Sequence, residues 1–329
     1  MKKVFILIIV FAFFLGVFFI FRNKENNFVS PLSGSIKKNL PLEKYSFLAL
    51  REKEYQASEI ILEKIISEEE EYTSWLFSYE SDGKKVTGML NIPKGEGSFP
   101  VVVMLRGYAD DEIYFTGLGT RKVAGIFAEN GFLTLAPDFL GFGGSDSSSA
   151  DILEARFERP ITVLSLLESI KTLEKADKDN IFLWGHSNGG QIAISVLEIL
   201  EREIPTTLWA PVVKGFPESV LYYMDDSPPP GADGEDDQGK KVKKAIDRFI
   251  KDYNEEDYSI ETYFSDIKAP IQIHYGGLDP LVPEDWIDDF IENFEKDVFY
   301  YKYPKSDHNL AQDWDEVVEK DIEFFRSFL

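Results

Sequence analysis

The sequence predicts an α/β fold in which helices cover both faces of a mostly parallel sheet. From Tyr72 onward, short apolar runs alternate with longer stretches of helical periodicity, and several runs are apolar at every position. Strands separated by helices of this length form parallel sheets. Continuous apolar runs are typical of strands that are buried on both faces. The expected sheet is eight-stranded, with strands at 75–79, 86–92, 101–105, 132–136, 181–184, 206–210, 271–275 and 298–303.

The first 22 residues have the pattern of a transmembrane helix. An uncharged apolar run covers 4–21, with Lys2 and Lys3 before it and Arg22 and Lys24 after it. A helix of this length extends roughly 27 Å, close to the thickness of a bilayer core. Bulky residues follow the run where a cleaved signal peptide needs small ones, which favours an uncleaved signal anchor. Both flanks carry two basic side chains, and the N-terminal amine favours a cytoplasmic N-terminus. We therefore expect a membrane-anchored protein whose following domain is extracytoplasmic.

Residues 23–71 are expected to connect this anchor to the folded domain. The stretch 23–40 is polar, contains Pro31 and Gly34, and is typical of a linker. The stretch 41–71 has a weak helical pattern that ends in the acidic run 68–71. We expect this extension to be a tether and the main domain to span 72–329.

The main domain begins with two strands joined by Ser81-Asp82-Gly83, a turn sequence that indicates an antiparallel hairpin. The segment 212–268 separates two strands by far more than a usual connection, and we expect it to form a small helical lid. Within it, Tyr222, Tyr223 and Met224 could line an acyl pocket or simply seat the lid. The expected helices are 121–130, 151–175, 190–203, 283–294 and 314–328, with an amphipathic stretch at 240–253 inside the lid.

Composition excludes several classes of function. The formal net charge is −23, whereas nucleic-acid binding and docking on anionic lipid both need a basic surface. The chain has no cysteine, which excludes disulfides, thiolate catalysis and cysteine-ligated zinc. No metal-ligand cluster, phosphate loop or dinucleotide motif is evident, so we expect no cofactor and no metal. The sequence does not indicate the oligomeric state.

The candidate nucleophile is Ser187, in the stretch GHSNGG at 185–190. This stretch matches the G-x-S-x-G elbow and lies between an expected strand and an expected helix, where such a turn exposes the serine hydroxyl. A serine needs a base and a group that orients the base. His308 follows the last strand, and Asp279 follows the strand 271–275, at the sheet edge where α/β sites are built. The order Ser187, Asp279, His308 is that of the α/β hydrolases.

The other histidines and acids near these positions have structural explanations. His186 occupies the variable position of the elbow and should point away from the nucleophile. His274 lies within an expected strand, where a hydrogen-bonded core histidine is the commoner case. Asp307 is expected to be a solvated loop charge, and Glu284 and Asp285 to be charges at a helix N-terminus.

An oxyanion hole completes the expected site. The backbone N–H of Asn188, directly after the nucleophile, is one donor. The sequences LRGY at 105–108, APDFLGFGGSD at 136–146, GGLDPLVP at 276–283 and SDHN at 306–309 resemble the prolyl oligopeptidase and dienelactone hydrolase branch of the α/β hydrolases, over roughly 72–329. That resemblance implies a second donor from Tyr108, either its hydroxyl or its N–H. Arg106 departs from the His or Tyr usual there. Asp138 and the glycines after it resemble a loop that shapes the floor of the site.

These features predict a serine hydrolase that cleaves carboxylic esters through an acyl-enzyme. A serine peptidase acting on short peptides is the main alternative, although the region before Tyr72 is too short for the propeller of prolyl oligopeptidases. A hydrolase fold used only for binding is a third possibility. The expected partners are a small-molecule ester or a short peptide as substrate, and the membrane through the N-terminal helix.

Overall fold

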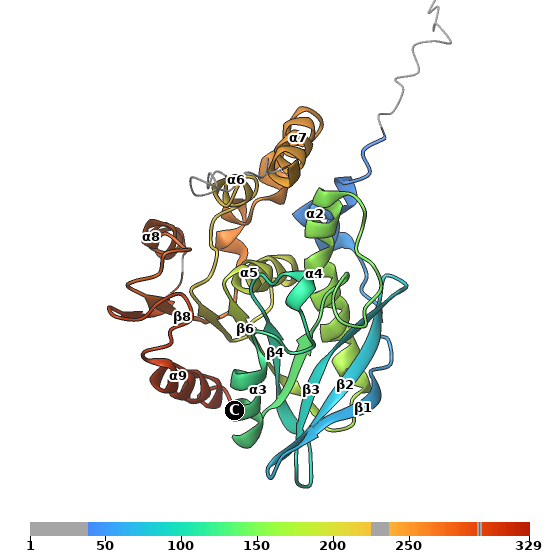
Figure 1. Ribbon diagram of the computed structural model, residues 1–329, viewed down its shortest axis with the longest axis vertical. Helices are drawn as coiled ribbons and strands as arrows, with labels where there is room; N and C mark the ends of the chain where they lie inside the picture. Colours follow the sequence, from blue (N-terminus) through green and yellow to red (C-terminus); the bar gives the residue numbers. More distant parts are fainter. Residues whose placement is uncertain (1–38, 225–236, 295, 297) are drawn as a thin grey trace, which may run out of the picture. The chain divides into compact units, whose positions relative to one another are not determined.

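A nine-stranded mixed sheet organises the computed structural model, which describes residues 39–224, 237–294, 296 and 298–329 (Figure 1). The strand order is β1-β2-β3-β5-β4-β6-β7-β8-β9, and the order reverses between β5 and β4. β1 to β3 and β5 pair antiparallel, whereas β4 to β9 pair parallel. The strands are β1 Ile61–Glu68, β2 Tyr72–Ser81, β3 Lys84–Pro93, β4 Phe99–Leu105, β5 Leu133–Pro137, β6 Ala176–His186, β7 Thr206–Trp209, β8 Ile271–Gly276 and β9 Val298–Tyr303.

The predicted anchor, 1–22, and most of the predicted linker lie outside the described residues. In the part that the structure describes, every helix is too short or too polar to span a membrane. The described residues between Pro41 and Leu329 form a single compact unit.

The stretch 41–71 is part of the fold, so the prediction of a tether and of an eight-stranded sheet was wrong. It contributes α2 (Phe47–Glu52) and the edge strand β1, which pairs with β2. Two register shifts interrupt that pairing, between Leu62 and Lys64 and between Ile65 and Ser67. Bulges of this kind break the two-residue alternation of a strand. The apolar residues at 61, 62, 65 and 66 therefore imitate the spacing of a helix.

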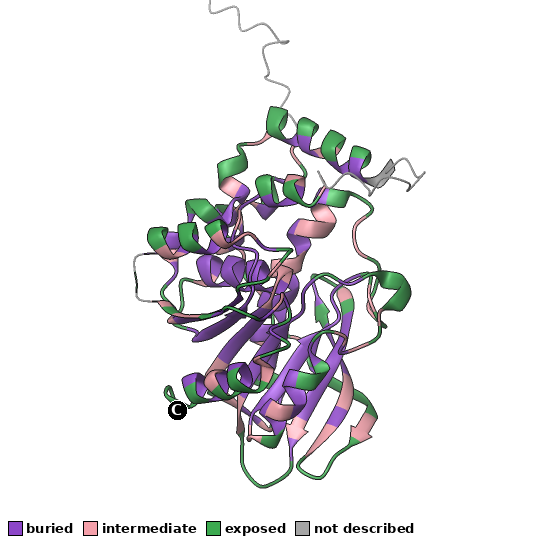
Figure 2. Cartoon of the chain, turned by 60° about the vertical axis from the view of Figure 1, so that its left-hand side comes forward, coloured by how far each residue is buried: buried purple, intermediate pink, exposed green. Residues whose placement is uncertain are grey.

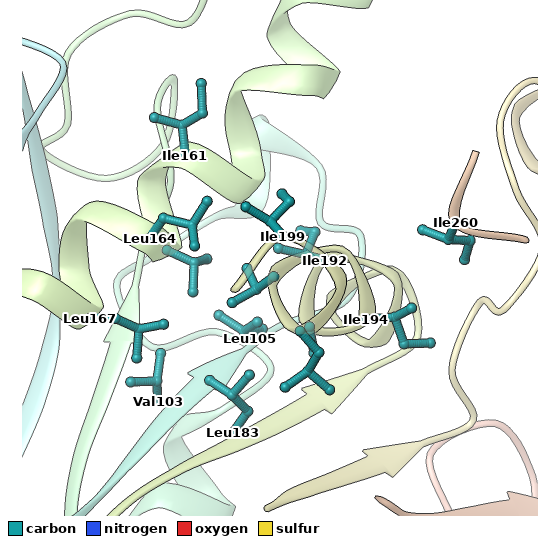
Figure 3. Close-up of a cluster of buried hydrophobic side chains, with 14 of the residues drawn as sticks. Val103, Leu105, Ile161, Leu164, Leu167, Leu183, Ile192, Ile194, Ile199 and Ile260 are labelled. Carbon is teal, nitrogen blue, oxygen red and sulfur yellow. The ribbon is translucent and has the colours of Figure 1, made fainter. Parts of the chain in front are cut away.

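The two faces of the sheet carry separate hydrophobic cores. Along β4, Val101, Val103 and Leu105 belong to one core, while Val102 and Met104 belong to the other. Side chains of a strand alternate between faces, so a strand buried on both faces is apolar throughout. Figure 3 shows the first core, where strand residues meet aliphatic side chains of α4 and α5.

Helices cover both faces of the sheet, as the sequence predicts. Arg121–Glu129 (α3) and Trp314–Arg326 (α9) contact each other and cover the second core, while α4 (Ile152–Ser169) packs against α5 (Asn188–Leu200) over the first. Figure 2 shows the helices with buried inner and exposed outer faces. The helix α8 (Glu284–Asn293) also covers the first core, through Trp286, Ile287 and Phe290.

The described part of the insertion 212–268 is helical. It contains α6 (Glu218–Tyr222), α7 (Asp237–Asp252) and three short 3₁₀ turns, Glu255–Tyr258, Ile260–Thr262 and Phe264–Asp266. Phe249 of α7 packs edge-to-face against Phe216 and Tyr258 of the insertion and at a tilt against Phe157 of α4, with ring centroids 4.7–5.7 Å apart. Aromatic pairs each stabilise by about 0.5–1.5 kcal/mol. This aromatic cluster therefore fixes the insertion over α4.

The strand register brings the functional loops together. Leu105 pairs with Gly185, and His186, Trp209 and His274 follow one another in register across β6, β7 and β8. Parallel strands in register end at one edge of the sheet, and ligands bind at that edge. The loops that follow β4, β6, β8 and β9 therefore meet there.

Candidate active site

Ser187 occupies the turn between β6 and α5 in a strained backbone conformation, with φ 53° and ψ −121°. Its N–H donates to the carbonyl of Trp209 at 2.9 Å, which holds the turn against β7. Strain of this kind persists only where the surroundings impose it, and it is common at active sites.

The glycines of the turn are required by close contacts. A Cβ on Gly189 would lie 1.9 Å from the carbonyl oxygen of Leu105, and one on Gly185 would lie 2.8 Å from that of Gly189. These distances leave no room for a side chain. The glycines therefore let strand, turn and helix approach one another around Ser187.

His308 and Asp279 form a hydrogen-bonded pair. His308 Nδ1 lies 2.8 Å from Asp279 Oδ2, and the Asp279 side chain is fully buried. The other carboxylate oxygen of Asp279 accepts the backbone N–H groups of Leu281, at 2.8 Å, and Val282, at 3.1 Å. This arrangement keeps the carboxylate fixed and assigns the Nδ1 proton to His308. Nε2 of His308 is then free to act as a base.

His186 joins the Ser187 turn to the His308 loop. Its ring lies 4.8 Å from the His308 ring, and its Nε2 is 3.1 Å from the His308 carbonyl oxygen. Burial, and secondarily the nearby charge of His308, lowers the pKa of His186 to about 4. The neutral ring therefore donates to that carbonyl. No hydrogen bond joins the Ser187 hydroxyl to His308 among the described residues, a looseness that is common in ligand-free sites.

The loop after β4 packs directly on the nucleophile. A Cβ on Gly107 would lie 3.1 Å from the Cβ of Ser187. Tyr108 is 79% exposed, and its hydroxyl donates to Asp110 Oδ1 at 2.7 Å. The structure thus gives the Tyr108 hydroxyl another partner than an oxyanion. The backbone N–H groups of Asn188 and Tyr108 remain the predicted donors.

Arg106, which departs from the family pattern, anchors this loop from within. Its guanidinium donates to the carbonyls of Gly107, at 2.9 Å, and Asp138, at 3.1 Å. It also lies 4.2 Å from the Phe142 ring centroid and 4.6 Å from that of Tyr114. Stacking between arginine and aromatic rings is favourable when the cation is desolvated. Arg106 therefore replaces the expected ring by packing among other rings.

Asp138 has the structural role expected for it. Its buried carboxyl group accepts the hydroxyls of Thr87 at 2.6 Å, Tyr114 at 2.7 Å and Thr116 at 2.9 Å. Burial raises the pKa of Asp138, and the three hydroxyls oppose that shift. A Cβ on Gly143 would lie 2.3 Å from this carboxylate. The network ties β3 to the two loops beside the site.

Tyr222, Tyr223 and Met224 lie at the end of α6. The rings of Tyr222 and Tyr223 are 4.8 and 6.2 Å from that of Trp286 on α8, and both tyrosines remain partly exposed. Met224 packs against the core of the first face. None of the three lines the cavity next to Asn188. This placement corresponds to seating the insertion on α8, one of the two predicted roles.

His274 is the core histidine that the sequence indicates. It is fully buried, with Nδ1 3.0 Å from the Tyr303 hydroxyl and Nε2 3.1 Å from Asp321 of α9. The same carboxylate accepts the indole N–H of Trp209 at 2.8 Å and the amide of Gln272 at 3.1 Å. This network joins α9 to three neighbouring strands.

Beside Asn188, a cavity of about 60 Å³ holds two side chains that sequence reasoning did not single out. Arg156 and Arg159 of α4 line it, together with Gln191 of α5. The available signal was the spacing of two arginines by three residues in a helix that is otherwise largely apolar on its inner side. Its other walls are mainly apolar and aromatic and include Tyr45, Phe47, Phe157, Phe216, Tyr258 and Ile260. Among the described residues, no cluster of His, Asp and Glu could hold a metal ion.

Comparison with known proteins agrees with this geometry. A family model for the alpha/beta hydrolase fold matches residues 100–205, which contain β4, β6 and the Ser187 turn. Over these residues the chain matches the α/β-hydrolase family, and its described residues have the α/β-hydrolase fold. The fold extends beyond the matched residues, because β8 and β9, which carry Asp279 and His308 at their ends, continue the same sheet.

Solved structures with a similar fold include esterases and a peptidase. Acetyl xylan esterase 1 from Thermoanaerobacterium sp. superposes with a TM-score of 0.62 at 14% identity, over 86% of this chain and 93% of that one. An acetyl xylan esterase from Paenibacillus sp. R4 gives a TM-score of 0.63 at 19% identity, over 84% and 91%. A dipeptidyl aminopeptidase IV assigned in Bacteroides ovatus gives 0.59 at 16%, over 78% and 36%. At these identities the likeness is one of fold.

A relative found by sequence comparison has no described activity. An uncharacterized 31.7 kDa Escherichia coli protein, from the traX-finO intergenic region, is 30% identical over 115 residues. That match covers 33% of this chain and 36% of the relative, so the chain aligns with about a third of its length.

Proposed function

We propose that this protein is a serine hydrolase that cleaves carboxylic esters through Ser187, His308 and Asp279. The observation that carries the proposal is the 2.8 Å bond from His308 to the buried Asp279, at the sheet edge where Ser187 sits in a strained turn. A buried carboxylate that fixes one tautomer of a histidine is the arrangement that a general base for serine requires.

In the proposed reaction, the Ser187 hydroxyl attacks the acyl carbon while Nε2 of His308 takes its proton. Asp279 stabilises the resulting imidazolium, and the N–H groups of Asn188 and Tyr108 hold the oxyanion. His308 then gives its proton to the departing alkoxide, which leaves an acyl-enzyme and a free alcohol. Water attacks the acyl-enzyme with His308 as base, and the carboxylic acid and the Ser187 hydroxyl are regenerated.

The His186 contact supports the proposal, because it ties the base loop to the nucleophile turn. A neutral His186 adds no competing charge next to His308. Reacting groups must be held within a fraction of an ångström for efficient transfer. A hydrogen bond between the two loops contributes to that precision.

Labelling of the full chain with a fluorophosphonate probe tests the proposal. We expect modification at Ser187, identified by peptide mass spectrometry, and its loss in Ser187→Ala. Ser327→Ala is the matched control, since Ser327 lies in the exposed C-terminal turn and only caps α9. If Ser187 stays unmodified in folded protein, and no ester in a broad panel is turned over, the chain is a binding protein with a hydrolase fold.

Ester and amide substrates separate the two enzymatic alternatives. The proposal predicts hydrolysis of 4-nitrophenyl acetate and butyrate at higher kcat/KM than that of alanyl and prolyl 4-nitroanilides. The opposite order would make the protein a peptidase, as the name of the Bacteroides ovatus neighbour indicates for that protein.

A further inference from the structure

Two arginines lie beside the proposed oxyanion hole. Arg156 and Arg159 project from α4 into the cavity that Asn188 and Gln191 of α5 also line. Gln191 is three residues after Asn188, roughly 4.5 Å along the helix. Arg156, which donates to Gln191, is therefore placed about one helical turn from the N–H group that would hold the oxyanion, and Arg159 lines the same cavity.

The charges of α4 are sorted by face. Glu154 pairs with Lys44 and Glu158 with Lys84, both at 3.0 Å. At 100° per residue, Arg156 and Arg159 lie on the side of the helix opposite these two glutamates. The glutamates of α4 thus form their salt bridges with lysines, and only Glu158 also acts on an arginine of the pair, by raising the pKa of Arg159 against the effect of burial.

Within the described residues, neither arginine makes a salt bridge. Arg156 donates to the side-chain oxygen of Gln191, a neutral partner, whose amide in turn donates to the Lys214 carbonyl at 2.6 Å. Arg159 has no hydrogen bond there; beyond the effect of burial, the charge of Arg106 lowers its pKa, and Glu158 and Tyr108 oppose that shift more weakly. Burial first, and the neighbouring positive charge second, lowers the pKa of Arg156 to about 9 and that of Arg159 to about 10. Both guanidinium groups are therefore cations at neutral pH, and a bound anion would stabilise these buried charges.

We infer that Arg156 and Arg159 form a subsite for a carboxylate on the acyl group of the substrate. The inference rests on the proposed function and narrows it to esters of short dicarboxylic acids. The planar fork of arginine matches a carboxylate with two parallel hydrogen bonds. The N-terminus of α5 adds a partial positive charge on the same side.

The cavity also fits the rest of such an acyl group. Its volume of about 60 Å³ and its largely apolar and aromatic walls suit a few methylene groups followed by one small polar end. The one-turn spacing between Asn188 and Gln191, to which Arg156 donates, is comparable to the length of a short acyl chain. In a chain of net charge −23, a local positive pocket favours the entry of an anionic acyl group.

Three 4-nitrophenyl esters with the same four methylene groups test the subsite: the mono-4-nitrophenyl ester of adipic acid, its methyl ester, and the 5-trimethylammonio-pentanoate. Nitrophenol release reports the same bond in each. For the natural chain we expect kcat/KM for the anionic ester to exceed that for the neutral one by about tenfold, from charge-assisted hydrogen bonds. The cationic ester should be slowest, and added salt should reduce the ratio of anionic to neutral ester.

Arg159→Gln and Arg156→Gln should each reduce this ratio several-fold, and Arg159→Lys should retain part of it. Arg202→Gln, an exposed arginine just after α5, is the matched control and should leave the ratio unchanged. Free adipate should also protect Ser187 from the fluorophosphonate probe better than hexanoate does, and this protection should weaken in Arg159→Gln.

The outcomes separate the two proposals. Hydrolysis of the neutral ester, without preference for the anionic one, overturns the subsite and leaves the proposed function standing. So does a ratio that Arg159→Gln and Arg156→Gln leave unchanged, or that Arg202→Gln lowers equally. Absence of probe labelling and of all turnover overturns the proposed function, and the subsite with it.

Discussion

Replacing Asp279 by asparagine should reverse the tautomer of the proposed base. Asp279 Oδ1 accepts two backbone N–H groups, from Leu281 and Val282, while Oδ2 faces His308 Nδ1. In Asp279→Asn the amide oxygen has to stay with the two N–H groups, so the amide nitrogen faces His308. Nδ1 must then accept, which puts the imidazole proton on Nε2 and removes the base.

The loss of activity in Asp279→Asn depends on the cost of the other orientation of the amide, which would restore the active tautomer. Turning the amide around would leave two buried N–H donors without an acceptor, at about 1–3 kcal/mol each. A penalty of about 2–6 kcal/mol for the active tautomer corresponds to a loss of roughly 30-fold to 10⁴-fold in kcat. The upper end is the loss found when the triad aspartate of a serine protease is replaced by asparagine.

Steady-state hydrolysis of 4-nitrophenyl butyrate measures this loss, with thermal unfolding as a check on folding. Asp307→Asn is the matched control, because Asp307 adjoins His308 and its Oδ1 likewise accepts two backbone N–H groups, from Asn309 and Ala311. We expect that control to retain most of its activity. A folded Asp279→Asn protein within threefold of the natural chain, or an equal loss in Asp307→Asn, would refute the tautomer argument.

Three further substitutions have defined outcomes. Gly189→Ala places a Cβ 1.9 Å from the Leu105 carbonyl oxygen, so differential scanning calorimetry should show destabilisation of about 3 kcal/mol, the upper end of the usual cost of overpacking; an unchanged Tm would contradict the contact. Glu198 is buried without a partner for its carboxyl group among the described residues, and burial raises its pKa. Below pH about 4.5 the carboxyl group is protonated in both the folded and the unfolded chain, so its burial does not make stability depend on pH. As the pH rises from there toward the folded pKa, the unfolded chain loses the proton first and the folded state loses stability. Urea unfolding of Glu198→Gln should therefore show an advantage that grows by up to about 1.4 kcal/mol per pH unit, and a constant difference would contradict the pKa shift. His186→Phe removes the donor to the His308 carbonyl and should lower kcat about tenfold by loosening the base loop, whereas unaltered kcat would show that this bond does not position His308.

The parts of the fold that the sequence predicts well are those with strong local signals. The strand 101–105 is apolar throughout because both cores need it, and the Ser187 turn is marked by glycines that contact its neighbours. The loops bearing Asp279 and His308 follow apolar strands, so their chain order alone placed them at one sheet edge.

The parts that the sequence did not predict depend on tertiary contacts. Bulges give β1 the spacing of a helix, so a strand was mistaken for a tether. The hydroxyl of Tyr108 donates to Asp110 instead of pointing toward an oxyanion at Ser187, and no sequence pattern distinguishes these two orientations. The cavity of Arg156 and Arg159 exists only because the insertion folds back over α4, which brings Tyr258 and Ile260 next to residues about a hundred positions earlier.

The carboxylate of Asp321 links the helix α9 to strands at the sheet edge that carries the proposed site. It holds the donors of Trp209, Gln272 and His274 at once, and His274 passes the connection to Tyr303. If α9 detached, these buried donors would lose their acceptor together, at a cost that makes independent fraying of the last helix rare. We therefore expect β7, β8, β9 and α9 to open as one cooperative unit, which amide hydrogen exchange would detect as similar protection of all four elements.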